Sequence, residues 1–152
     1  SQPGAPLDPD LDELEPGGQP VAISRLEQQH PIYHSGIGQA ARIVVADRGE
    51  WERVWARMWH NHHPVPPVPA VDFDRELVIV AAMGARHTGG YSIRVDEARS
   101  YGDHLTIHAV ETSPGRGCVT TQAFTAPVDV VKIPRTAAEI RFRTSPVVRE
   151  CD

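Results

Sequence analysis

The stretch from Met83 to Ile93, MGARHTGGYSI, concentrates residue types that often do chemistry: glycines beside an arginine, a histidine, a threonine and a tyrosine. Phosphate-binding loops need glycines at a fixed spacing between a strand and a following helix. Gly84, Gly89 and Gly90 do not have that spacing, and the residues that follow have the pattern of a strand. The sequence therefore predicts no nucleotide site here.

Two interpretations of this stretch remain. Glycine readily adopts the positive φ angles of a tight reversal, so the stretch can be a structural hairpin between two strands. The alternative is a loop that contacts another protein, because it also carries side chains typical of exposed positions. The candidate partner-binding residues are Arg86, His87, Thr88, Gly89, Gly90 and Tyr91.

Histidine is a common metal ligand, but the spacing of the histidines in this sequence does not support a metal site. Neighbouring residues such as His60, His62 and His63 rarely complete a tetrahedral site by themselves. His104 and His108 would stand about 13 Å apart on one strand face, too far for one ion. With Thr106 between them they predict a polar face turned to solvent, and we expect neither a metal nor another cofactor.

No catalytic signature is present. The chain has no G-x-S-x-G elbow, no H-E-x-x-H and no glycosidase-like pair of carboxylates. We therefore nominate no catalytic residue and expect a non-enzymatic protein.

Cys118 and Cys151 are the two cysteines. In a domain of this size they can form a disulfide that ties the C-terminal end to an earlier strand. A free pair in a reducing compartment is the alternative.

Charge and composition divide the chain in two. The net charge is -5, and five acids without a base lie in the first sixteen residues, so the remainder is about neutral. Residues 1–19 are rich in Pro, Gly and acid, which predicts a disordered leader, and residues 20–152 are predicted to form one globular domain. No basic patch indicates nucleic-acid binding, and no segment has the roughly 20 apolar residues of a membrane helix.

The helices and strands that position these residues can be predicted from the spacing of the hydrophobic residues. Trp51, Trp55 and Trp59 stand four apart and predict a helix over 48–60, with Asp47 as its N-cap and Glu50 as capping-box partner. The proline-rich stretch after it, 64–69, predicts an extended strap along the domain. Strands are expected at 21–29, 39–46, 76–83, 90–98, 104–112, 118–126, 128–134 and 139–144.

Seven or eight short strands joined mostly by short turns favour antiparallel pairing. The predicted fold class is α+β: a dominant antiparallel sheet, or two curved sheets, with one amphipathic tryptophan-rich helix packed on it. The residues 76–83 are apolar throughout, as expected of a central strand covered on both faces.

In this order the pieces resemble the C-terminal domain of PrcB-type proteins, a bacterial protease-complex subunit family. The pattern is a Trp-containing helix, a V-D-F entry into an apolar strand, a T-G-G-Y block, a G-C pair and a closing V-x-I-P strand. The matching residues are Trp51, Trp55, Val71, Asp72, Phe73, Gly84, Thr88, Gly89, Gly90, Tyr91, Ile93, Pro114, Gly117, Cys118, Thr125, Pro127 and Val131 to Pro134.

The resemblance implies an exported accessory domain that binds another protein, with a protease as the candidate partner that it stabilises or inhibits. It implies a periplasmic, envelope or secreted setting, with lipid anchoring through the leader as a further implication. It implies no cofactor and no catalytic residue, and it favours pairing of Cys118 with Cys151. Alternatives are an envelope module that binds a small molecule or carbohydrate near Arg86, Tyr91 and Arg94, and an unrecognised hydrolase.

Overall fold

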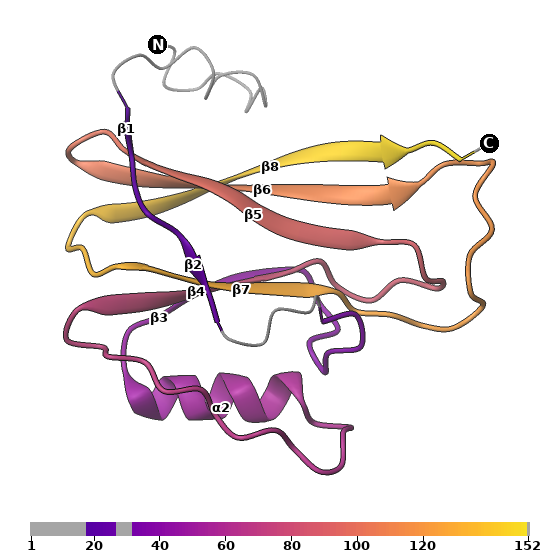
Figure 1. Ribbon diagram of the computed structural model, residues 1–152, viewed down its shortest axis with the longest axis horizontal. Helices are drawn as coiled ribbons and strands as arrows, with labels where there is room; N and C mark the ends of the chain where they lie inside the picture. Colours follow the sequence, from indigo (N-terminus) through magenta and orange to yellow (C-terminus); the bar gives the residue numbers. More distant parts are fainter. Residues whose placement is uncertain (1–17, 27–31, 152) are drawn as a thin grey trace.

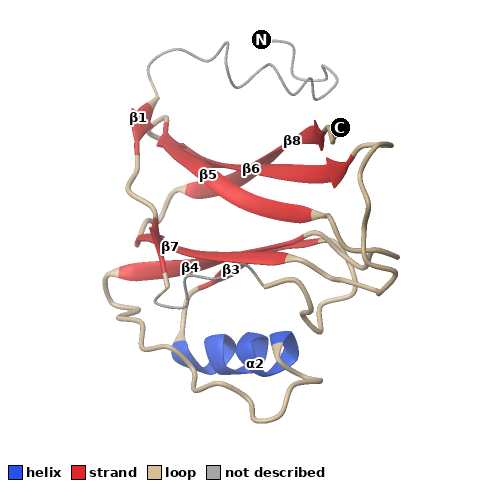
Figure 2. Ribbon diagram, turned by 45° about the vertical axis from the view of Figure 1, so that its right-hand side comes forward, coloured by secondary structure: helices blue, strands red, loops and turns tan. Residues whose placement is uncertain are grey.

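The computed structural model describes residues 18–26 and 32–151, and the structural statements below concern these residues. They form two four-stranded sheets packed face to face, with one helix on the outer face of one sheet (Figure 1 and Figure 2). The predicted α+β class, mostly antiparallel and with a tryptophan-rich helix, is confirmed. The elements are β1 (Gln19–Pro20), β2 (Ser24–Arg25), β3 (Ala41–Val45), α2 (Arg48–Met58), β4 (Glu76–Ala82), β5 (Ser92–Ser100), β6 (His104–Pro114), β7 (Val128–Pro134) and β8 (Glu139–Arg149).

The helix-bearing sheet has the order β2-β7-β4-β3 and is antiparallel throughout. β4 lies in its interior, and its alternate side chains enter two different apolar clusters. Leu77 and Ile79 face the second sheet, whereas Val78 and Val80 face α2. Burial on both faces explains why β4 is apolar at nearly every position.

The second sheet has the order β1-β5-β6-β8. β5 and β6 pair antiparallel, with a bulge between Val95 and Glu97. β8 lies at the edge of this sheet and runs parallel to β6, so the antiparallel pattern has one exception among the described strands. Parallel pairing requires a crossover connection, and β7, which belongs to the other sheet, lies within it.

α2 packs through its tryptophan stripe. Trp51, Trp55 and Met58 are buried against the helix-bearing sheet, as the period predicts. Asp47 is the N-cap, and its Oδ1 accepts from the backbone N–H of Glu50 at 2.8 Å. The Glu50 carboxylate accepts from Ala46 N at 3.3 Å, one residue earlier than a standard capping box.

The proline-rich strap is confirmed as a structural cover for α2. The indole N–H of Trp51 donates to the carbonyl of Pro69 at 3.0 Å, and that of Trp55 donates to Pro66 at 2.8 Å. Proline has no N–H to donate, but its carbonyl is free to accept, so the strap satisfies two buried indoles.

Three local predictions are wrong, and all concern pairing partners. The stretch 83–93 is no hairpin, because β4 and β5 belong to different sheets. Residues 118–126 are a loop rather than a strand, with only isolated bridges at Thr125 and Ala126. Of the strand expected at 21–29, the structure has only the two-residue β2, which pairs in the helix-bearing sheet, while β1 lies just before that range in the other sheet; residues 27–29 lie outside the described part.

The expected solvent face of β6 is also partly wrong. His104 and Thr106 are buried, at 9% and 6% exposure. His104 stacks on Tyr101, with ring centroids 5.0 Å apart. Thr106 is paired in register with Arg99 on one side and Arg141 on the other, and long side chains on neighbouring strands can cover a short one.

The leader predicted at 1–19 lies outside the described residues except for its end. Gln19 is the first residue of β1 and pairs with Ser100. From there the chain crosses to β2 in the other sheet, so residues 19–25 connect the two layers (Figure 1).

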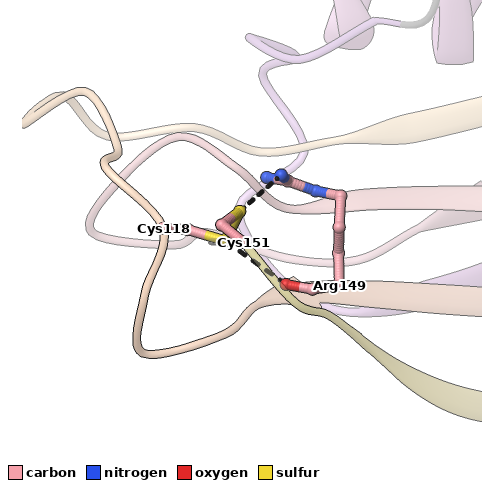
Figure 3. The surroundings of a disulfide bond; sticks show 3 residues. All are labelled: Cys118, Arg149 and Cys151. Carbon is pink, nitrogen blue, oxygen red and sulfur yellow. Dashed lines mark hydrogen bonds between the residues drawn. A yellow bond between two sulfur atoms is a disulfide. The ribbon is translucent and has the colours of Figure 1, made fainter.

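A disulfide joins Cys118 and Cys151, which confirms the predicted pairing (Figure 3). It ties the end of β8 to the start of the loop that leaves β6. The Sγ of Cys118 lies 3.3 Å from the carbonyl oxygen of Arg149. A disulfide sulfur has no hydrogen to donate, so this is a close contact; the Arg149 guanidinium, in contrast, donates to Cys151 Sγ at 3.1 Å.

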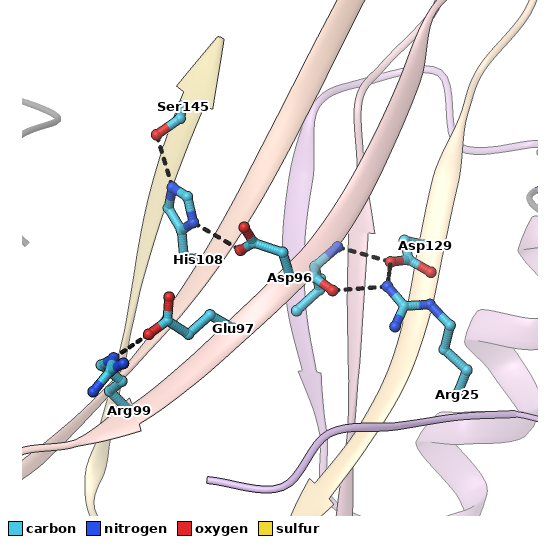
Figure 4. A network of polar contacts seen from close by, with 8 residues as sticks. Arg25, Asp96, Glu97, Arg99, His108, Asp129 and Ser145 are labelled. Atoms are coloured by element: carbon cyan, nitrogen blue, oxygen red, sulfur yellow. Dashed lines mark hydrogen bonds and ion pairs between the residues drawn. The ribbon is translucent and has the colours of Figure 1, made fainter. Parts of the chain in front are cut away.

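Two arginine clamps join the layers. Arg25 on β2 donates to Asp129 on β7 and to the carbonyl of Val95 on β5, and Asp129 also accepts from Val95 N, all at 2.7 Å (Figure 4). Arg42 on β3 donates to Glu111 at 3.0 Å and to Thr144 at 2.9 Å. These bonds satisfy polar groups between two sheets that otherwise pack through apolar side chains.

Candidate functional site

The glycine-rich loop, residues 84–91, connects β4 in one sheet to β5 in the other. Gly84 and Gly90 have φ angles of 90° and 95°, which side-chain-bearing residues rarely adopt. Glycine is thus required here as predicted, although for a change of sheet and not for a hairpin.

A second loop, residues 115–127, lies against the first one (Figure 1). Arg86 and Thr125 exchange both backbone hydrogen bonds, at 2.8 and 3.0 Å, and Gly89 N donates to the carbonyl of Thr121 at 3.0 Å. The Thr125 hydroxyl donates to the carbonyl of Thr88 at 2.9 Å. The two loops therefore form one hydrogen-bonded unit, which we call the paired-loop surface.

Close approach between the loops explains the glycine pair. A Cβ at Gly89 would lie 2.4 Å from the hydroxyl of Thr121, and one at Gly90 would lie 3.0 Å from both Pro114 and Thr120. Any side chain at either position would push the loops apart.

The side chains of the glycine-rich loop have different roles. Tyr91 is half-buried and packs on the apolar cluster between the sheets. The Arg86 guanidinium lies over the Tyr91 ring, 5.5 Å from its centroid. His87 is exposed, and its ring lies 5.5 Å from that of Phe124 on the second loop. Of the six predicted partner-binding residues, Arg86 and His87 place polar side chains at the surface, and Gly89, Gly90 and Tyr91 shape the loop. The sixth, Thr88, accepts the Thr125 hydroxyl through its carbonyl and so joins the two loops.

Apolar side chains are exposed on the same surface. Val119 is fully exposed and Phe124 is 71% exposed, both on the second loop, and Tyr33 is 43% exposed. The segment that carries Tyr33 joins the loops because Ala126 N donates to its carbonyl at 2.7 Å. Exposed aromatic and aliphatic groups on fixed backbone are typical of protein-binding surfaces.

A pocket of about 320 Å³ opens between these segments. Gly89, Gly90 and Tyr91 of the predicted loop form part of its wall, whereas Arg86 and His87 lie outside the wall. The rest of the wall is Tyr33, His34, Ser92, Thr121, Thr125 and Arg149.

A separate polar relay lies on the outer face of the second sheet. His108 on β6 contacts Asp96 on β5 through Nδ1 and Ser145 on β8 through Nε2, each at 2.7 Å (Figure 4). The order carboxylate–imidazole–hydroxyl is that of a catalytic triad. The neighbouring Glu97–Arg99 ion pair shares this face.

Two carboxylates near β6 have shifted acidity. The hydrogen bond with His104 lowers the pKa of Asp103, and the hydrogen bond with Arg141 lowers the pKa of Glu139. Both carboxylates are largely exposed and lie away from the paired loops, so they indicate local ion pairing and not a functional site.

Of the three histidines after α2, His60 and His63 are exposed and His62 is half-buried. His62 contacts the Trp59 ring, with centroids 4.8 Å apart. Among residues 18–26 and 32–151, no three His, Cys, Asp or Glu side chains come together in an arrangement for a metal ion. No helix in the same part of the chain is long and apolar enough to cross a bilayer.

Fold and surface together define a two-layered β domain that presents fixed loops at one end. Residues 77–134 match the family described as PrcB C-terminal, so the predicted relation to that family is confirmed over this segment. The match covers β4 to β7; the tryptophan helix and the V-D-F stretch that also carried the resemblance lie outside it. No curated protein gave a significant match. Nor did any solved structure.

Sequence reasoning missed the second loop, the pocket and the relay. Residues 118–126 have the composition of a strand, and that pattern does not predict an exposed loop. Ser145 meets His108 only because β8 is parallel to β6 in one particular register, which no local pattern encodes. The signal for an exposed loop is the polar run Thr120, Thr121 and Gln122 shortly before Phe124.

Proposed function

We propose that this protein is an exported, non-enzymatic accessory domain that binds another protein through the paired-loop surface. One observation carries the proposal: exposed Val119 and Phe124 stand on a loop whose backbone is fixed. Ordering a loop on binding costs free energy, and a loop that is already ordered avoids that cost. Fixed, exposed apolar groups are therefore what a binding surface requires.

The disulfide supports an oxidising setting, such as the periplasm, the cell envelope or the extracellular space. The relation to the PrcB C-terminal family supports a protease as the partner, which the domain would stabilise or inhibit. The partner class rests on that relation, whereas the choice of surface rests on the loops themselves.

The test is recovery of a partner from an envelope extract by tagged protein. We expect the Val119→Ser/Phe124→Ser variant to lose a protein that the wild type retains, and mass spectrometry of the eluate to identify that protein as a protease. Val65→Ser is the matched control, because Val65 is also an exposed apolar residue, at 47%, but lies on the strap that covers α2. Equal recovery by all three forms would remove the paired-loop surface from the proposal.

A second function is favoured by the Asp96–His108–Ser145 relay. If Ser145 were a nucleophile, its Oγ would attack an ester carbonyl, His108 Nε2 would accept the hydroxyl proton, and the alcohol would leave with that proton. Water would then hydrolyse the acyl-enzyme. One feature weighs against this: many hydrolases stabilise the oxyanion with the N–H of the residue after the nucleophile, and here that residue is Pro146, which has none.

A fluorophosphonate probe separates the two functions, because it labels activated serines. We expect no labelling of Ser145 above that of a His108→Gln variant. Stoichiometric labelling of the wild type that disappears in that variant would favour the hydrolase.

A further inference from the structure

The residues that line the pocket in the paired-loop surface indicate which chemical group of a partner protein it binds. This inference rests on the proposed function. Its walls come from both loops, from the segment at Tyr33 and His34, and from the end of β8. A volume of about 320 Å³ is at the small end of ligand pockets. It suits one side chain or one chain terminus better than an extended ligand.

The lining is rich in hydrogen-bond donors and contains no acid. Arg149 supplies a guanidinium, and hydroxyls come from Tyr33, Tyr91, Ser92 and Thr121. The Thr125 hydroxyl is already used, since it donates to the carbonyl of Thr88. A wall with a cation and no carboxylate favours an anion over a cation.

Arg149 is positioned before any ligand arrives. It ends β8, and its carbonyl accepts from Gly115 N at 2.9 Å. Its guanidinium donates to the sulfur of Cys151, whose disulfide to Cys118 holds the two chain segments together (Figure 3). A guanidinium presents its N–H groups in a rigid fork that matches the two oxygens of a carboxylate.

Two exposed apolar residues neighbour the pocket wall in sequence. Phe124 immediately precedes the wall residue Thr125, and Val119 lies two residues before the wall residue Thr121. If one group of a partner protein enters the pocket, the residues next to that group in the partner can contact Phe124 and Val119, and apolar residues suit those contacts. This is the pattern of a peptide in which an anchoring group is flanked by apolar side chains.

We infer that the pocket binds a carboxylate of the partner protein, with Arg149 as its counter-ion and Phe124 and Val119 as contacts for the flanking residues. The carboxylate has two possible sources, an acidic side chain or the C-terminus of the partner chain, and both present the same two oxygens.

Small probes test this inference without knowledge of the partner. Amide resonances of Gly89, Gly90 and Thr121 are followed by NMR while N-acetyl-glutamate α-amide, N-acetyl-phenylalanine or the neutral N-acetyl-glutamine amide is added. The first probe represents an acidic side chain and the second a chain terminus. We expect shifts with at least one carboxylate, and binding about tenfold weaker for the neutral amide, since a charge-assisted hydrogen bond is lost.

Arg149→Gln should weaken carboxylate binding by about tenfold for the same reason. Arg53→Gln is the matched control, because Arg53 is an exposed arginine on α2 at the other side of the helix-bearing sheet, and it should leave binding unchanged. Thermal unfolding of both variants shows that each is folded.

Three outcomes would overturn the inference: no binding of either carboxylate, equal binding of the neutral amide, or no effect of Arg149→Gln. These outcomes are distinct from failure of the proposed function. If partner recovery still depends on Val119 and Phe124, that function stands without the carboxylate; if it does not, the function fails whatever the probes show.

Discussion

Removal of the disulfide is the perturbation whose effect on stability follows most directly from the structure. Cys118 and Cys151 are separated by 33 positions and close a loop that contains β7 and β8. Cross-linking removes conformations from the unfolded chain, and for a loop of this length the chain-entropy relation gives about 3.7 kcal/mol at 25 °C. Replacing both cysteines by alanine should lower the free energy of unfolding by about that amount.

The expected shift in the thermal midpoint follows from the size of the domain. At about 2.1 cal/mol/K of unfolding entropy per residue, a folded region of about 130 to 150 residues should lose about 12–14 °C in its thermal midpoint. Both numbers are measured on the Cys118→Ala/Cys151→Ala variant, by urea unfolding followed by circular dichroism and by calorimetry.

The control is the wild type with a phosphine reductant, which should unfold like the double variant, while the variant itself should not respond to reductant. A loss below about 1 kcal/mol in both preparations would refute the reasoning, because the loop entropy is fixed by sequence separation. It would mean that the unfolded chain is already compact in this region without the cross-link.

The remaining predictions concern the clamp, the loop and the surface charges. Asp129→Asn should cost about 1.5–3 kcal/mol in urea unfolding, because the interlayer clamp loses a charged acceptor; an unchanged midpoint would show that the clamp is not stabilising. Gly90→Ala should cost about 1–2 kcal/mol, since φ is 95° there, and it should broaden the amide signals of the paired loops, whereas the same change at the open Gly38 should do neither. His104→Asn should raise the pKa of Asp103 toward its ordinary value, as read from carbon-detected NMR titration. Because the folded pKa of Asp103 is lowered, its contribution to stability is present above the unfolded pKa and is lost as pH falls through the folded value; an unchanged titration would exclude His104 as the cause.

Local elements were predictable because local patterns encode them. The four-residue period of the tryptophans gave α2, the prolines gave the strap, and the unbroken apolar run of β4 gave a strand buried on both faces. Each of these depends on residues close in sequence. Asp47 as N-cap belongs to the same class, since the cap and its partner are three residues apart.

Pairing was not predictable from such patterns. Nothing between Met83 and Ile93 distinguishes a hairpin from a passage between sheets, because both need glycine at positive φ. The parallel direction of β8 depends on a partner about 35 positions away in sequence. The same limit applies to the site: the glycine-rich loop was identified, but the loop that lies against it was not.

The clamp of Arg25, Asp129 and Val95 has a consequence for sliding motion. Shear between packed layers is a common way for proteins to change shape, and charged hydrogen bonds across the layers oppose it. Tyr91, Ser92 and Arg149 of the pocket belong to one layer, while Thr125 leads into a strand of the other. A slip of the layers would displace one wall of the pocket past the opposite wall, so the clamp opposes a change in the shape of a pocket that it does not line.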